Sequence, residues 1–401
     1  MQRIIAWYRE QTEVQDGYLP ALDGLRALMI LIIVSFHIWQ QSWLTPVLPW
    51  FGRSISLDFI LRSGYLWVDG LLLLSGFLLY LPYAQRGTRP LPPVGPFYRR
   101  RFFRIVPTYL LNLLVVFLVV ALPEKRYATP WAATRDILAH MTFTHNLFPF
   151  SYLHTPLNGA LWTLAVEVQF YLLFPLLARA FRRMPVVTYL GMAGIAFGYR
   201  AWAGTLADSS LYFNQLPAFL DVYANGFVAA GIYVSMRRLK EDGWSRVLMT
   251  VCAALAVYGL LALCRAQAAE QAGEFIRRGQ MNRRFLLSVL LSVLMLGTTL
   301  GLGGVRLLLG NRITRVMSQI SYQMYMWHQV LAVQLRTWGI PASAHALPNQ
   351  VGDRVWQRSY ELLCYMGALV ISALVTYLIE QPIARRFSGR ARTKKTKEAS
   401  T

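Results

Sequence analysis

The feature that most constrains this chain is a succession of long apolar stretches, each about as long as a helix that crosses a lipid bilayer. Of the 401 residues, 55% are hydrophobic and only 15% are charged. The predicted spans are 24–43, 65–84, 105–123, 160–181, 185–203, 217–236, 247–264, 285–303, 319–337 and 359–380. We therefore expect an all-α fold, a polytopic membrane helix bundle of about ten transmembrane helices, which forms one domain over residues 1–387.

Positive charge is spread unevenly between the two sides of this predicted bundle. The net charge is +21, and most Lys and Arg fall in segments that face inward when the N-terminus is inside. The positive-inside rule then places both termini in the cytoplasm, with residues 388–401 as a basic, disordered tail. Charged residues are too scarce for a typical soluble nucleic-acid-binding protein, so no nucleic acid is expected as a partner. The outer segment 265–284 goes against the rule through Arg277, Arg278, Arg283 and Arg284.

Smaller features limit what else the chain contains. Residues 136–150 (DILAHMTFTHNLFPF) suggest an eleventh span, but a crossing there would move later arginine clusters outside, so we expect an interfacial or re-entrant segment. The N-terminus lacks both the continuous apolar core and the small-residue cleavage site of a signal peptide. No disulfide framework or metal site is expected from the spacing of Cys252, Cys264, Cys364, His140, His145 and His154.

Ionisable residues within a membrane span are costly and usually functional, and four lie in the predicted spans: Arg26, His37, Glu167 and His328. Arg26 and His37 are eleven residues apart, which puts them on one stripe of the first helix, roughly 16 Å apart along its axis. Both histidines fall near mid-membrane, and Glu167 is expected about two turns below the outer surface. Two histidines and a carboxylate suit an acid/base centre in which the carboxylate orients an imidazole. A proton relay in a transporter, or structural pairing alone, explains the same residues.

Arg101 and Arg104 share a helix face where the third span enters from the cytoplasm. Guanidinium groups suit bidentate binding of phosphate, as a CoA-like or nucleotide ligand requires. Such clusters also mark the cytoplasmic side of any membrane protein, so position alone does not assign a ligand. Asp69, near the outer end of the second span, is expected to cap or anchor that helix. The chain has no GxxxxGK[ST], GxGxxG or GxSxG motif to support P-loop, Rossmann or serine-hydrolase chemistry.

Six motifs follow one another between residues 21 and 387: ALDGLRALMILIIVSFH, VDGLLLLSGF, RRRFFRIVP, LWTLAVEVQFYLLFPLL, ISYQMYMWH and IEQPIARRF. In this order they resemble the acyltransferase family 3 integral membrane proteins. The resemblance implies a ten-helix enzyme of the cell (inner or plasma) membrane. It would move an acyl group, usually acetyl from cytoplasmic acetyl-CoA, onto a hydroxyl of a sugar or other cell-envelope acceptor.

The resemblance also implies roles for individual residues. Arg26 and His37 match the family's Arg-x10-His pair, and RFFR from Arg101 to Arg104 matches its basic motif near the donor site. Further matches are Glu167, at the acidic position of W-S-L-x-x-E, and His328, at the end of Y-x-x-Y-x-x-H. This chain has Val168 where many members have a second polar residue, which leaves the neighbourhood of Glu167 open.

The residues and the resemblance together predict an acyl relay across the membrane. His37 would act as general base, taking the proton of the acceptor hydroxyl and returning it to the leaving thiolate, with Glu167 or His328 in support. Arg26, Arg101 and Arg104 would hold the acyl-CoA. An acceptor that approaches from outside is expected to meet Glu167 before it reaches His37.

Two other classes of function stay open at this point. A proton-coupled transporter of a saccharide or lipid-linked saccharide would also use mid-membrane His and Glu, although the paired broken helices and internal repeat of many transporters are not visible. A membrane sensor or scaffold would show no turnover and would tolerate replacement of His37.

Overall fold

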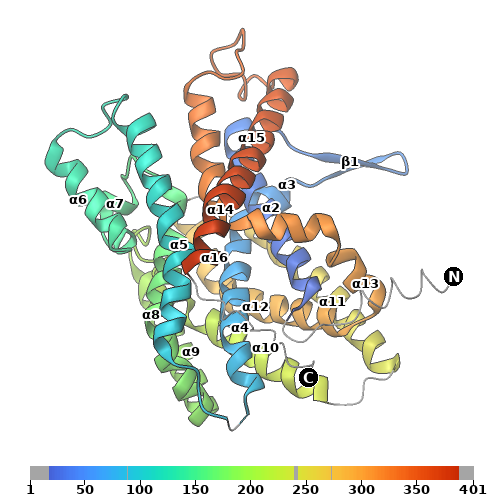
Figure 1. Ribbon diagram of the computed structural model, residues 1–401. Helices are drawn as coiled ribbons and strands as arrows, with labels where there is room; N and C mark the ends of the chain where they lie inside the picture. Colours follow the sequence, from blue (N-terminus) through green and yellow to red (C-terminus); the bar gives the residue numbers. More distant parts are fainter. Residues whose placement is uncertain (1–17, 88, 239–242, 272, 388–401) are drawn as a thin grey trace, which may run out of the picture.

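The computed structural model describes residues 18–87, 89–238, 243–271 and 273–387, and this part of the chain is almost wholly helical (Figure 1). The predicted tail 388–401 lies outside the described residues. Ten described helices of 19 to 28 residues correspond one to one with the predicted spans: α2 (Pro20–Ser42), α4 (Trp67–Gln85), α5 (Val94–Val116), α8 (Trp162–Arg183), α9 (Pro185–Thr205), α10 (Leu220–Arg238), α11 (Gly243–Ala268), α12 (Gly273–Leu300), α14 (Arg312–Thr337) and α15 (Arg354–Val375). The predicted all-α membrane bundle is confirmed.

Eight of the described spans are both long and apolar enough to cross a membrane. The other two long helices, α9 and α14, are less apolar because they carry buried polar side chains. On α9, Arg200 forms a buried ion pair with Asp221 of α10 at 2.6 Å. On α14, Ser321 and His328 are buried within the bundle. Both helices therefore keep the length of a span while polar groups on their inner faces lower their hydropathy.

Two of the helices begin much earlier than their apolar stretches predict. Helix α5 begins at Val94, so Arg101 and Arg104 lie inside it rather than before it. Helix α12 begins at Gly273, so the expected outer loop 265–284 is a helix over much of its length. Polar side chains continue these helices beyond the apolar core, since an α-helix satisfies its own backbone hydrogen bonds in any solvent.

The outer arginines that go against the positive-inside rule are paired with acidic groups. Arg277 contacts Glu274 at 2.7 Å, and Arg283 contacts Glu270 at 2.7 Å. Arg284 contacts Asp69 at 3.0 Å, with both side chains fully buried. Of the two expected roles, Asp69 therefore takes that of an anchor: it joins α4 to α12. These ion pairs neutralise the arginines. The segment 265–284 can therefore lie on the outer side although unpaired arginines would be disfavoured there.

The segment before α8 folds into a small cap rather than a spanning helix. It contains α6 (Pro130–Met141), a 3₁₀ turn (His145–Leu147) and α7 (Pro149–Tyr152). Helix α6 has 12 residues, about 18 Å of rise, which is too short to cross a bilayer. In this cap the rings of His140 and His145 stack at 4.1 Å, and Asp136 contacts His140 at 3.1 Å.

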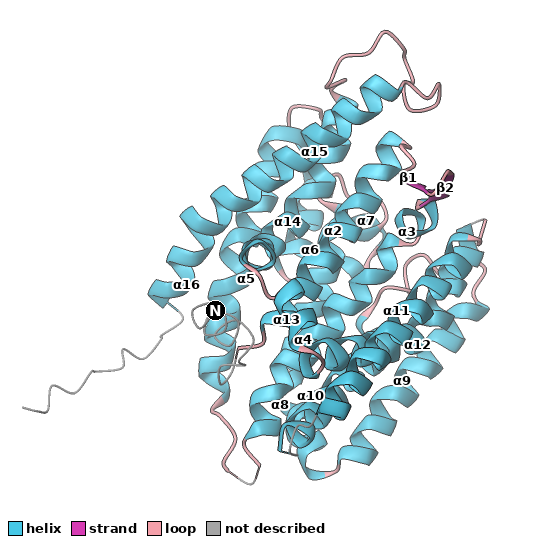
Figure 2. Cartoon of the chain, turned by 90° about the vertical axis from the view of Figure 1, so that its right-hand side faces the viewer, coloured by secondary structure: helices cyan, strands magenta, loops and turns pink. Residues whose placement is uncertain are grey.

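The remaining elements are short. Figures 1 and 2 show a hairpin of β1 (Val47–Trp50) and β2 (Arg53–Ser56) that projects from the bundle after α2. The short helices are α3 (Asp58–Arg62), α13 (Gly303–Leu309) and α16 (Gln381–Phe387). Helix α2 packs against α4, α12, α14 and α15 and so lies at the centre of the bundle.

Helices α4 and α10 approach each other through glycines. A Cβ on Gly226 would lie 2.6 Å from the carbonyl oxygen of Leu73, and one on Gly76 would lie 3.0 Å from that of Tyr223. Small residues at helix contacts let backbones pack closely where apolar burial alone gives no advantage over lipid. This contact sets the position of α4, which forms one wall of the site described below.

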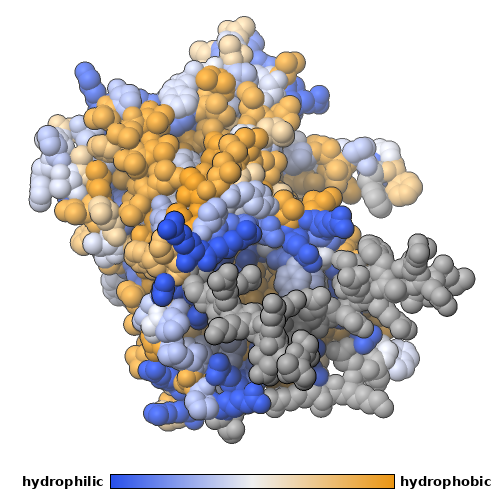
Figure 3. All heavy atoms as spheres, in the orientation of Figure 1, coloured by the Kyte–Doolittle hydropathy of each residue, from blue (hydrophilic) through white to orange (hydrophobic). Residues whose placement is uncertain are grey.

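The outer surface of the bundle is largely apolar. Large hydrophobic side chains such as Leu114, Leu176 and Leu190 are exposed on α5, α8 and α9. In Figure 3 apolar atoms cover much of the upper part of the molecule, and hydrophilic atoms gather in a middle band and at the lower end. A water-facing surface of this kind would be costly, whereas lipid tails cover it without loss.

Candidate functional site

Five helices (α2, α4, α5, α8 and α14) surround a cavity of about 150 Å³ inside the bundle. Its polar wall consists of Arg26, Ser75, Arg101, Arg104, Thr163, Glu167, Tyr171, Ser321, Tyr322 and Tyr325. The other lining residues are aliphatic. The three arginines and the glutamate that the sequence singled out are therefore brought together, although they come from three different helices.

The three guanidinium groups are available to a ligand. Arg26 and Arg101 are partly buried, and Arg104 is exposed to the cavity. Arg101 lies over the ring of Tyr171, 5.2 Å from its centroid, which holds the guanidinium plane without using its N–H groups. Within the described part of the chain, none of the three forms a hydrogen bond or an ion pair. Each guanidinium carries five N–H donors in a planar fork, the arrangement that suits a phosphate.

Glu167 is the carboxylate that faces these arginines. It accepts a hydrogen bond from Ser75 Oγ at 3.1 Å and another from the Tyr171 hydroxyl, one helical turn away on α8. One negative charge among three positive charges leaves the cavity with an excess of positive charge. The site is thus suited to an anionic ligand, with Glu167 held on one side by neutral donors.

The two histidines form a separate pair. The rings of His37 and His328 lie 5.0 Å apart, centroid to centroid. His328 Nδ1 is 3.0 Å from the carbonyl oxygen of Met324 and 2.7 Å from that of Tyr325. A carbonyl only accepts, so Nδ1 carries the proton and Nε2 keeps its lone pair. Within the described residues this buried Nε2 has no hydrogen-bond partner, so it is free to accept a proton.

His37 is oriented from its own helix. Its Nδ1 lies 3.0 Å from Oε1 of Gln40, one turn further along α2. His37 is partly buried, while His328 is 1% exposed. The link to the cavity is Tyr325, which lines the cavity and whose ring centroid lies 5.6 Å from that of His328. The pair is therefore next to the cavity, behind Tyr325.

Glu167 does not join the histidine pair as expected. Asn158, just before α8, donates a hydrogen bond to the Met326 carbonyl of α14 at 2.6 Å, so α8 begins at the level of the histidine pair. The cap of α6 and α7 occupies the space above it. Glu167 lies five residues into α8, on the arginine side of the pair, and contacts neither histidine. The imidazoles are oriented by carbonyl oxygens and Gln40 rather than by Glu167.

Several site residues were not singled out from the sequence. Ser75 and Tyr171 hold Glu167, and Gln40 orients His37. Asp23 accepts hydrogen bonds from Tyr18 at 2.5 Å and from Ser318 at 2.7 Å, which ties the start of α2 to α14. Helical spacing offers a signal for Tyr171 and Gln40, four and three residues from their partners. No local signal identifies Ser75, whose partner is on another helix.

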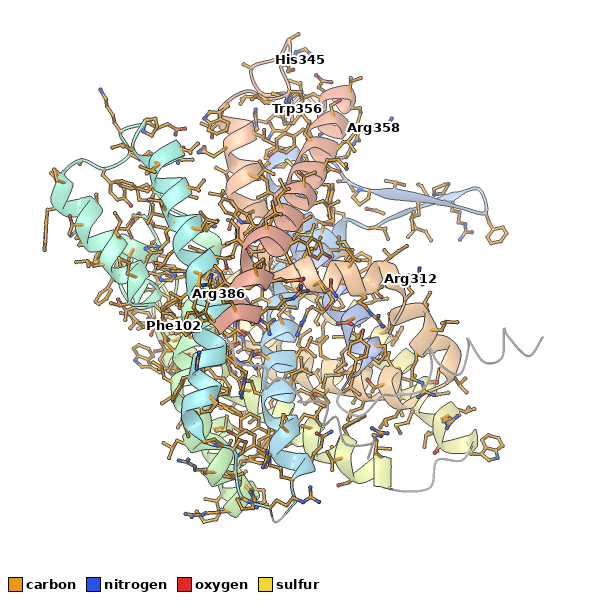
Figure 4. The ribbon with its side chains drawn as sticks, in the orientation of Figure 1. Phe102, Arg312, His345, Trp356, Arg358 and Arg386 are labelled. Atoms are coloured by element: carbon orange, nitrogen blue, oxygen red, sulfur yellow. The ribbon has the colours of Figure 1, made fainter. Side chains whose placement is uncertain are left out.

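The arginine-bearing part of α5 is supported by the end of the chain that the structure describes. The rings of Phe103 and Phe387 stack at 4.8 Å, and Figure 4 shows Phe102 and Arg386 side by side where α5 meets α16. Nearby, Glu380 accepts a hydrogen bond from Gln323 of α14 at 2.7 Å. The ring contact holds this part of α5 against α16.

Several known proteins are similar in sequence to this chain. A family model described as an acyltransferase domain matches residues 19–378. A protein of Acidianus two-tailed virus named as an acetyltransferase, ORF330, is 27% identical over 336 residues, or 82% of this chain and 88% of the viral protein. The O-acetyltransferase OatA of Staphylococcus aureus is 31% identical over 170 residues, 40% of this chain and 24% of OatA. Acyltransferase MdmB of Streptomyces mycarofaciens is 29% identical over 171 residues, 42% of this chain and 41% of MdmB.

The extent of these matches differs. The chain matches only about a quarter of OatA and less than half of MdmB, whereas the family model extends over nearly all of the described bundle. No solved structure matches the chain significantly. The matched range includes the cavity and the histidine pair. On this evidence the chain, a multi-pass helical membrane protein, belongs to the acyltransferase family 3 of integral membrane proteins.

Proposed function

We propose that this protein transfers an acyl group, most simply acetyl, from cytoplasmic acyl-CoA to a hydroxyl of a carbohydrate or other cell-envelope acceptor at the plasma (inner) membrane. The observation that best supports this proposal is the cavity in which Arg26, Arg101 and Arg104 present unpaired guanidinium groups beside the His37–His328 pair. Anion-binding donors next to a proton acceptor match what transfer from a phosphate-bearing thioester requires.

The arginines define the donor side. Phosphate groups of the acyl-CoA would be held by Arg101 and Arg104 where α5 enters the bundle, with both chain termini on that same cytoplasmic side. The cavity leads past Glu167 to Tyr325, and the histidine pair lies beyond. A small passage lined by both aliphatic and hydroxyl-bearing side chains suits a thin pantetheine arm better than a nucleotide.

The histidines define the proton transfer. His37 takes the proton from the acceptor hydroxyl as its oxygen attacks the thioester carbonyl carbon; the C–S bond breaks, and the proton passes from His37 to the departing thiolate sulfur. The ring of His328 lies 5.0 Å from this imidazole and keeps an Nε2 lone pair, which would stabilise the protonated form of His37. Gln40 keeps His37 in one tautomer.

Replacement of His37 by Ala tests the proposal. We expect transfer, measured as CoA thiol released in the presence of acceptor, to fall by about 10²–10⁴-fold because the general base is lost. Membrane insertion of the variant should not change. Mass spectrometry that compares envelope glycans from cells with wild-type protein and from cells with His37→Ala would identify the acceptor. Wild-type turnover by a well-folded His37→Ala protein would remove the basis for this mechanism.

A further inference from the structure

A second hollow lies at the C-terminal end of α8, outside the cavity. It has a volume of about 440 Å³ and is lined by Leu91, Arg179, Arg182 and Arg183. Leu91 belongs to the connection between α4 and α5, so the groove lies between α8 and the entry to the arginine-bearing helix. Figure 3 shows hydrophilic atoms gathered at this lower end of the molecule.

The positive charge of this groove is not neutralised within the described part of the chain. Arg179 and Arg183 are exposed and Arg182 is partly buried; none of them takes part in an ion pair or a hydrogen bond there. This distinguishes them from the arginines of α12, whose charges are matched by Glu270, Glu274 and Asp69. Three unpaired guanidinium groups around a hollow form a site for a phosphate group.

The groove is aligned with the cavity along one face of α8. Arg182 follows Tyr171 by eleven residues, so the two share a stripe of the helix at an axial distance of roughly 16 Å. Tyr171 is the residue on which Arg101 stacks. The hydroxyl of Tyr98 donates to the Leu172 carbonyl at 2.9 Å, which holds the arginine-bearing part of α5 alongside α8.

An aromatic cluster lies between the two arginine groups. The ring of Tyr83, at the end of α4, lies 5.3 Å from that of Phe174 on α8, which lies 5.2 Å from that of Phe97 on α5. Arg101 lies over Phe97, 5.8 Å from its centroid, and Arg179 of the groove is among the charges near Tyr83. An extended ligand with two separate phosphate centres would contact both groups at once.

We propose that Arg179, Arg182 and Arg183 bind the 3′-phosphate of the acyl-CoA donor, an assignment that rests on the function proposed above. CoA carries a diphosphate and, at its nucleoside end, a separate phosphomonoester. The diphosphate is assigned to Arg101 and Arg104, which leaves the phosphomonoester for a positive site further out along α8. A lipid headgroup offers the same phosphate chemistry, and the experiment distinguishes the two sources.

Binding of CoA and of 3′-dephospho-CoA to the purified full-length protein, measured by calorimetry in detergent, requires no knowledge of the acceptor. We expect wild-type protein to bind CoA about tenfold more tightly than 3′-dephospho-CoA, as one charge-assisted phosphate contact predicts. The double variant Arg182→Ala/Arg183→Ala should bind CoA only as tightly as wild-type protein binds 3′-dephospho-CoA, and its affinity for 3′-dephospho-CoA should not change. Arg182→Lys/Arg183→Lys should recover part of the preference for CoA. The matched control is Arg312→Ala. Arg312 is an exposed arginine at the start of α14, and Figure 4 shows it far from α5. The affinities of this variant for CoA and for 3′-dephospho-CoA should equal those of wild-type protein.

Each other outcome has a definite meaning. Equal wild-type affinity for the two ligands would overturn the 3′-phosphate site and leave the CoA-dependent function intact. Weaker binding of both ligands by the double variant, to the same extent, would also overturn it, because the arginines would then act only through general charge. Loss of a co-purified anionic lipid from the double variant in native mass spectrometry, with the preference for CoA retained, would assign the groove to lipid. Absence of wild-type binding to either ligand would instead contradict the proposed donor itself.

Discussion

At the scale of single residues, the two histidines show how a membrane interior orients an imidazole without a carboxylate. The carbonyl oxygens of Met324 and Tyr325 hold the Nδ1–H of His328. A carboxylate partner would itself have to be desolvated at this depth, whereas a carbonyl oxygen of the same helix is already present. Glu167 is thereby left to serve the arginine cavity.

His328→Gln tests this arrangement. Glutamine keeps a polar group at the position but cannot accept a proton, so we expect the rate of transfer to fall by about 10²-fold while CoA affinity is retained. Kinetics and calorimetry on the same preparation measure the two effects separately. In wild-type protein with ¹⁵N-labelled histidine, the His328 signal should be that of the Nδ1–H tautomer. A loss of CoA affinity with unchanged turnover would place His328 in the donor site instead.

Glu167→Gln addresses the charge balance of the cavity. Removing the one carboxylate among three guanidinium groups removes repulsion of the donor phosphates, so we expect CoA to bind at least as tightly as in wild-type protein. Arg104→Ala should bind CoA more weakly, since it removes a donor from the same cavity. Calorimetry with CoA measures both. Weaker CoA binding by Glu167→Gln would show that the glutamate holds the donor directly.

At the scale of helices, close backbone contacts set the walls of the site. Helix α4 carries Ser75 and meets α10 through Gly76 and Gly226. The neighbours that a Cβ on Gly226 would approach include backbone atoms of Leu73 and Phe77, which cannot rotate away as a flexible side chain would. A small change on α10 is therefore expected to shift a wall of the cavity.

Gly226→Ala should lower the free energy of unfolding by about 1–3 kcal/mol, the usual effect of added volume in a well-packed interior. Thermal unfolding of the detergent-solubilised protein measures the change. The matched control is Gly191→Ala on α9, where nothing lies within 4 Å of the added Cβ, so alanine should be neutral or stabilising. Equal stability of the two variants would contradict the close contact.

At the scale of the whole molecule, α2 carries an arginine and a histidine at two different levels of the bundle, and on the proposed function these levels correspond to the donor and acceptor sides. Arg26 lines the cavity near the start of the helix, and His37 meets His328 further along, towards the hairpin of β1 and β2. The donor would enter from the arginine side, and the acceptor would approach the histidine pair from the other. Both would meet within the bundle without either crossing the membrane completely.

Oriented vesicles test this two-sided arrangement. With acetyl-CoA only on the side of Arg101 and acceptor only on the opposite side, we expect acylated product to form on the acceptor side. Reversing the two compartments should abolish transfer, because the arginines would then face no donor. A requirement for both substrates on one side would contradict transfer across the membrane, although the acyltransferase family assignment would stand.

The sequence by itself determined the bundle and most of the candidate site. Ten apolar stretches predict ten long helices because a bilayer admits almost no other spanning structure, and a long helix overlaps each predicted range, although α5 and α12 begin much earlier. The costly ionisable residues within them (Arg26, His37, Glu167 and His328) did converge on one region, since such groups face inward. Local sequence pattern is sufficient to predict both the helices and the inward orientation of these residues, because lipid requires every span to be helical and to turn its ionisable side chains away from the bilayer.

Only the tertiary structure decided how these residues are grouped. The sequence grouped Glu167 with the two histidines, but the bond from Asn158 to Met326 of α14 places the start of α8 beside the histidine pair, so the glutamate, further along α8, joins the arginines. The early start of α12 and the pairing of Arg284 with Asp69 were likewise missed. The physical reason is common to these cases: the depth of a helix and the partner of a buried charge depend on other helices far away in sequence, which local pattern does not describe.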